Sequence, residues 1–89
     1  MNIQIIEAHA EHTQSGRYFV ADMDSGKHAI SVMFSPDRVY VIVKNASHRA
    51  WRGGGKYFGN AAEAVAAYKT GEIRAMIELA AQLNAEQAA

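Results

Sequence analysis

The residues best suited to chemistry lie at positions 48–58, which read His-Arg-Ala-Trp-Arg-Gly-Gly-Gly-Lys-Tyr-Phe. Arginine and lysine attract phosphates, aromatic rings stack on unpaired bases, and glycine lets a loop approach a backbone closely. Proteins bind single-stranded nucleic acid without sequence readout by these means. The segment therefore predicts a surface for an anionic partner, with single-stranded nucleic acid as the first candidate. Its predicted contacts are Arg49, Trp51, Arg52, Lys56 and Tyr57.

Two other interpretations of residues 48–58 are available. In the first, the aromatic rings close one end of the core and the cations are solvated. In the second, the glycines form a phosphate-binding loop before a helix that opens at Gly59-Asn60. The second conflicts with the sequence, because Tyr57 stands where a P-loop requires serine or threonine and no buried parallel strand precedes it.

The distribution of charge supports an anionic partner. The chain is formally neutral, with nine Lys and Arg against nine Asp and Glu. Residues 38–62 hold five bases and no acid, whereas the segments on either side are net acidic. A basic segment in an otherwise acidic chain is typical of a surface that meets negative charge.

Two histidine clusters could support other chemistry. His9 and His12, with Glu7 and Glu11 beside them, would share a face and could hold a metal if the segment were helical. The sequence around them predicts a strand end that runs into a polar loop, which scatters these side chains, so we expect no metal site.

The second cluster is His28 with Asp22 and Asp24, which suggests acid–base chemistry. The turn requires Asp24, however, and the chain has no cysteine and no serine in a nucleophile-elbow context. We therefore predict no enzymatic activity, no catalytic residue and no cofactor.

The elements that position these residues follow from length and pattern. At 89 residues and 49% hydrophobic, the chain has room for a single core, so residues 1–89 are expected to form one domain. No signal peptide or membrane span is evident, and a cytoplasmic location is the expectation. Strands are predicted over residues 2–8, 17–23, 27–34 and 38–44, with a loop over 11–16.

Short turns join the last three predicted strands into antiparallel hairpins. A turn at Ser25-Gly26 sets Met23, Ala21 and Phe19 opposite His28, Ile30 and Val32, respectively. A turn at Pro36-Asp37 sets Phe34, Val32 and Ile30 opposite Val39, Val41 and Val43. All these residues share one face, which is apolar except at His28 and is therefore the predicted core face.

The other side of the predicted sheet, termed the reverse face, is more apolar than a water-facing sheet requires. Two explanations are possible. The first strand or the 45–58 loop covers these residues within the chain, or the reverse face is a contact surface for another molecule. If it is a contact surface, Tyr18, Val20, Tyr40 and Ile42 form a dimer or partner interface. We therefore expect a homodimer, and a protein–protein adaptor is the alternative function.

Helical patterns complete the chain. Asn60 and Glu63 have the spacing of a capping box, and Ala61, Ala64, Val65 and Tyr68 follow on one stripe. Thr70 can cap a second helix, whose stripe is Ile73, Met76, Ile77, Ala80 and Leu83, with fraying expected after Leu83.

The predicted fold class is α+β, an antiparallel four-stranded β-meander followed by one or two C-terminal helices packed on one face of the sheet. This order is similar to that of the positive-cofactor family of single-stranded-DNA-binding domains, which dimerise through their helices. The similarity is one of architecture and involves no shared residue motif.

Overall fold

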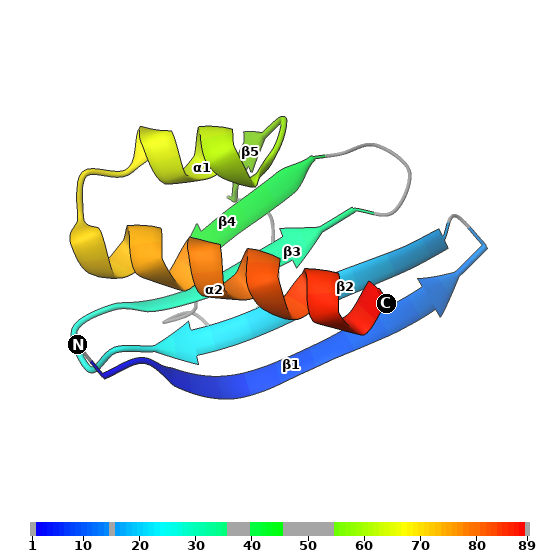
Figure 1. Cartoon of the computed structure of the whole chain (residues 1–89), viewed down its shortest axis with the longest axis horizontal. Helices are drawn as coiled ribbons and strands as arrows, with labels where there is room; N and C mark the ends of the chain where they lie inside the picture. Colours follow the sequence, from blue (N-terminus) through cyan, green and yellow to red (C-terminus); the bar gives the residue numbers. More distant parts are fainter. Residues whose placement is uncertain (1, 15, 36–39, 46–54, 89) are drawn as a thin grey trace.

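The computed structural model describes residues 2–14, 16–35, 40–45 and 55–88, which form five strands and two helices (Figure 1). The strands are β1 (Gln4–Thr13), β2 (Gly16–Asp24), β3 (Ala29–Phe34), β4 (Val41–Asn45) and β5 (Lys56–Phe58). The helices are α1 (Ala61–Ala67) and α2 (Gly71–Ala88).

The strands form one antiparallel sheet in the order β1-β2-β3-β4-β5, and both helices lie on the same side of it (Figure 1). The predicted α+β class is confirmed. The predicted count of four strands is one too few, because Lys56–Phe58 pairs with β4 as a fifth strand. A strand of three residues is too short to show an alternating pattern in the sequence.

The loop between β2 and β3 is longer than predicted. The backbone N–H of Ser25 donates to the carbonyl of His28 at 2.9 Å, so the loop includes both residues. Asp24 Oδ1 accepts the N–H of Gly26 at 2.6 Å, and Gly26 adopts a φ of 90° that glycine tolerates without strain. The predicted register is therefore wrong by two residues: the observed pairs are Met23↔Ile30, Ala21↔Val32 and Phe19↔Phe34.

The loop between β3 and β4 corrects the second hairpin in the same way. Ser35 N–H donates to the Tyr40 carbonyl at 3.1 Å, and the observed pairs are Phe34↔Val41, Val32↔Val43 and Ile30↔Asn45. A shift of two residues keeps every side chain on its original face, whereas a shift of one would reverse it. For the described residues of β2, β3 and β4 the predicted assignment to the two faces therefore stands, although both registers were wrong; Val39 lies outside the described residues.

Strand β1 also differs from the prediction. It extends to Thr13, which pairs with Gly16, so the loop predicted over 11–16 is mostly strand. The register shifts between Ile5 and Glu7, which leaves Ile6 as a bulge. Beyond the bulge, pairing with β2 is regular from Glu7 to Thr13. The end of β1 was not predicted as a strand because its residues are polar. Polar residues are tolerated there because one face of this strand is not buried.

The helices begin where the sequence predicts. Asn60 Oδ1 accepts the N–H of Glu63 at 2.8 Å, and Glu63 Oε2 accepts the N–H of Gly59 at 2.7 Å. The Thr70 carbonyl accepts the N–H of Arg74, so α2 begins directly after Thr70. The expected fraying after Leu83 is wrong, because alanine, glutamine and glutamate, which favour helix, carry α2 to Ala88. Within the described residues, no helix combines the length and apolar character needed to cross a membrane.

The core lies between the helices and one face of the sheet. Met76, Ile77 and Ala80 of α2 are fully buried against the predicted core face. At the far end of α2, Arg17 Nη1 donates to Asn84 Oδ1 at 2.9 Å and ties the helix to β2. The buried cluster comprises Phe19, Ala21, Met23, Ile30, Val32, Val41, Val43, Ala64, Met76, Ile77 and Ala80.

Replacing Met76 by alanine should lower the free energy of unfolding by roughly 2–5 kcal/mol, because it leaves a cavity beneath α2. Ile6→Ala is the matched control. Ile6 is 64% exposed at the bulge, so its truncation should change stability by only about 0.5 kcal/mol. Urea unfolding measures both, and equal losses would contradict this core.

Candidate functional site

The reverse face carries a continuous row of side chains across all five strands. The cross-strand pairs His9↔Val20, Val20↔Met33, Met33↔Ile42 and Ile42↔Tyr57 place these residues side by side. The row is apolar at its centre. It ends in the imidazole of His9 on one side and in the phenol of Tyr57 on the other. Val20 and Ile42 are only 8% and 9% exposed, and each is flanked by row neighbours on both sides. Tyr57 is 68% exposed.

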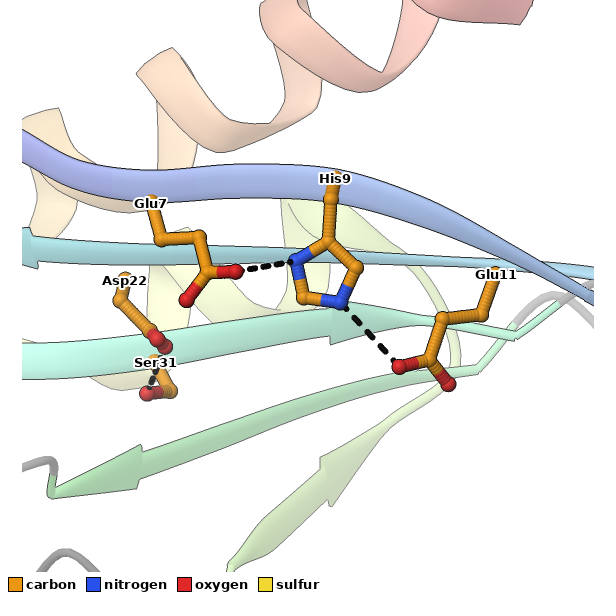
Figure 2. Close-up of polar contacts among 5 residues, drawn as sticks. All are labelled: Glu7, His9, Glu11, Asp22 and Ser31. Atoms are coloured by element: carbon orange, nitrogen blue, oxygen red, sulfur yellow. Dashed lines mark hydrogen bonds and ion pairs between the residues drawn. The ribbon is translucent and has the colours of Figure 1, made fainter.

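A polar row lies beside the apolar row. Glu7 pairs with Asp22, Asp22 with Ser31, and Ser31 with Lys44. The buried Ser31 hydroxyl donates to the Asp22 carboxylate, which satisfies a group that would otherwise be costly to bury (Figure 2). The Asp22 carboxylate is therefore already engaged within the sheet.

His9 lies between two carboxylates on its own strand. Its Nδ1 is 3.3 Å from Glu7 Oε1, and its Nε2 is 3.2 Å from Glu11 Oε1 (Figure 2). The three side chains share a face because residues two apart on a strand point the same way. Of the two contacts, the one between Nε2 and Glu11 has the geometry of a hydrogen bond, whereas Nδ1 has no hydrogen-bond partner among the described residues.

The prediction that a loop scatters the side chains of this histidine and glutamate cluster is therefore wrong, because the segment belongs to strand β1. His12 is set apart from Glu7, His9 and Glu11, since its odd spacing from them turns it to the other side of β1. Among the described residues, no three histidine or carboxylate side chains are grouped so as to hold a metal ion.

The two rows border a hollow of about 500 Å³ on the reverse face. Its floor is apolar, with Val20, Met33 and Ile42, and Tyr57 lies at one side. The described charged residues of its lining are the carboxylates Glu7, Glu11 and Asp22 and the cation Lys44. The hollow can therefore receive an apolar group and favours positive charge beside β1.

A glycine permits close approach at the β5 end of the hollow. A Cβ on Gly55 would lie 2.5 Å from Ile42 Cγ2 and 3.3 Å from Lys44 Cγ. No side chain fits there unless Ile42 moves. The sequence prediction attributed the glycines of residues 53–55 to a nucleic-acid loop, whereas Gly55 has a packing role.

The structure divides the predicted anion-binding set. Lys56 and Tyr57 are neighbours on β5 and point to opposite faces of the sheet. Lys56 Nζ lies 5.7 Å from the Tyr68 ring centroid on the helix side, whereas Tyr57 pairs with Ile42 on the reverse face. Arg49, Trp51 and Arg52 lie outside the described residues.

The predicted partner face is brought together. Tyr57 joins it, because its ring centroid lies 5.7 Å from that of Tyr40, with 35° between the planes. Tyr18 and Tyr40 are half-buried. Val20 and Ile42 are largely covered by their neighbours in the row, so only a small part of each side chain is exposed on the floor of the hollow. The sequence prediction missed Glu7, His9 and Glu11 on this face. Continued alternation from Ala8 to Glu11 was the signal that could have revealed them.

The three residues of the His28 cluster have separate surroundings in the structure. Asp22 bonds Ser31, Asp24 bonds the backbone of Gly26, and His28 lies in the loop that Ser25 closes. On the helix side, burial raises the pKa of the Tyr68 phenol above its ordinary value of 10.0, and its ring makes an edge contact with that of Phe58.

The chain matches no protein-family model, and no curated protein or solved structure is significantly similar to it. Function is therefore inferred from the chemistry of the reverse face.

Tyr57→Ala should leave the free energy of unfolding within about 1 kcal/mol of the parent value, because the side chain is mostly exposed. Ile42→Ala, one strand away in the same row, should cost roughly 2–5 kcal/mol because that side chain is buried. Thermal or urea unfolding of both variants distinguishes a contact residue from a structural one. A large loss for Tyr57→Ala would mean that Tyr57 belongs to the fold.

Proposed function

We propose that the chain is a small binding module whose reverse face contacts a protein partner. The observation that carries this proposal is the hollow of about 500 Å³, which has an apolar floor and an exposed tyrosine at its side. Protein interfaces commonly combine an apolar centre, aromatic side chains and a charged rim. The role requires no catalytic group.

The sign of the charge favours a protein over nucleic acid on this face. Among the described residues that line the hollow, Glu7, Glu11 and Asp22 outnumber Lys44, so a phosphate backbone laid across the β1 side would meet repulsion. A lysine or arginine of a protein partner would be attracted to the same carboxylates. The partner surface should therefore combine an apolar side chain for the hollow with a base directed toward β1.

Single-stranded nucleic acid is the second candidate, confined to the β4 and β5 side of the sheet. Tyr57 supports it, because its exposed ring lies tilted beside that of Tyr40 and could carry a base. The basic composition of residues 38–62 favours it as well. In this role the acidic residues of β1 would limit the strand to the opposite half of the face.

Selection of phage-displayed random peptides against the folded chain should enrich sequences that place an apolar residue near lysine or arginine. Binding of a selected peptide should weaken by ~1–2 kcal/mol in Tyr57→Ala, because an exposed interface tyrosine is a common hot spot. Glu11→Gln should weaken it in a salt-dependent way, since it removes one rim charge.

The matched control for this selection is Glu78→Gln. Glu78 is exposed on α2, on the other side of the sheet, so its loss should leave peptide affinity unchanged. Enrichment of acidic peptides, or equal affinity for all three variants, would contradict the proposed interface.

The nucleic-acid candidate predicts that short single-stranded oligonucleotides bind at low salt and weaken steeply as salt rises. Tyr57→Ala should cost ~1–3 kcal/mol of stacking with little change in salt slope. Lys44→Ala should flatten the slope more than Lys56→Ala, because Lys56 points to the helix side. Fluorescence titrations at two salt concentrations measure these effects. If the folded protein does not bind oligonucleotides at low salt, binding to a protein partner remains the proposed function.

A further inference from the structure

The two edges of the sheet are protected very differently. β5 is a short edge strand of three residues that carries Lys56. β1 is an edge strand of ten residues with neither lysine nor proline. Short length, lysine and proline are devices that keep edge strands from pairing with other chains. β1 therefore presents a long row of backbone groups on the side away from β2.

The bulge on β1 limits this edge to a defined segment. The register shift at Ile6 interrupts the strand near its beginning, and pairing with β2 is regular from Glu7 to Thr13. Among the described elements, β1 packs extensively against β2 alone, and it is the outermost strand in Figure 1. The regular segment has its midpoint at Ala10.

We propose that two copies of this chain associate by antiparallel pairing of β1 with β1, about a twofold axis at Ala10. Pairing about this midpoint uses the whole segment from Glu7 to Thr13 and excludes the bulge. The result is one continuous sheet through both copies, with both helical layers on the same side. The proposal does not depend on the partner of the reverse face.

The side-chain pairs across the twofold axis support this register. With Ala10 opposite its own copy, His9 lies opposite Glu11 of the second copy, and symmetry forms the same pair twice. A register centred on His9 instead would set Glu7 opposite Glu11 and place like charges together. At the centre, two alanines face each other, and their small side chains leave room for the strands to approach.

The arrangement also changes the surroundings of His9 by adding a carboxylate beside its ring. Within one chain its two ring nitrogens face Glu7 and Glu11, and the second copy adds another Glu11 across the strand pair. It further aligns the two hollows side by side on one surface. A bivalent partner could then contact both copies.

Cysteine cross-linking tests the register directly, because the chain has no cysteine of its own. Ala10→Cys should form a disulfide-linked dimer under mild oxidation, since paired Cα atoms lie about 4.5–5.5 Å apart, within disulfide range. Ala8→Cys alone and His12→Cys alone should not cross-link, because equivalent positions are then separated by about 13 Å along the strands. A mixture of these two variants should cross-link, since positions 8 and 12 are opposite.

Light scattering of the reduced parent chain should give a dimer mass at micromolar concentration. A monomer at that concentration would overturn the proposal. Equal cross-linking of all three single-cysteine variants would indicate random collision and would also overturn the proposal. Failure of Ala10→Cys to cross-link in a folded dimer would do the same.

A charge exchange provides a second test. Glu11→Lys should raise the dimer dissociation constant about tenfold, because it sets lysine opposite His9 in both symmetric pairs. The double variant His9→Glu with Glu11→Lys should restore association. Glu78→Lys makes the same change of charge on exposed α2 and should have no effect. Association that is unchanged in Glu11→Lys, or not restored in the double variant, would overturn this register.

Discussion

The packing of α2 against one face of the sheet is the interaction on which the structure depends. Met76, Ile77 and Ala80 are fully buried there, and the facing side chains of β2, β3 and β4 complete the core. A chain of this length forms a single core and hides a modest share of its surface. Both described helices pack on this side of the sheet, so neither of them covers the reverse face.

The alternation of side chains along each strand then determines the chemistry of the reverse face. Once Phe19 and Val32 point to α2, their neighbours Val20, Asp22, Ser31 and Met33 must point away. The same rule separates Lys56 from Tyr57 and aligns Glu7, His9 and Glu11. Among the described residues, the face therefore has an acidic side at β1, an apolar centre and an aromatic side at β5.

The sheet edges add a second asymmetry. A three-residue strand with a lysine ends the sheet at β5, whereas the ten residues of β1 end it on the other side. Pairing through β1 would leave the reverse face accessible, so a dimer and a partner complex can coexist. The two surfaces thus have different chemistry: backbone hydrogen bonding at the edge, and apolar and charged side chains on the face.

The sequence by itself determined the fold class, the cap at Asn60, the start of the second helix after Thr70, and the division of β2, β3 and β4 into two faces. These features depend on local signals: period-two alternation, helical stripes and capping side chains. The alternation survives a register shift of two residues, which is why the faces were correct when both hairpin registers were not. Hydrogen bonds at Ser25 and Ser35 set the loop lengths, and their partners were not evident from the turn residues alone.

Only the tertiary structure decided how the candidate residues group. β1 continues through His9 and Glu11 because β2 pairs with it, although its polar sequence resembles a loop. β5 exists because β4 offers a partner to three residues whose own pattern is too short to specify a strand. Proximity along the chain suggested that Lys56 and Tyr57 act together. The pleat of the sheet sends them to opposite faces, and a side chain's direction depends on the strand that its backbone joins.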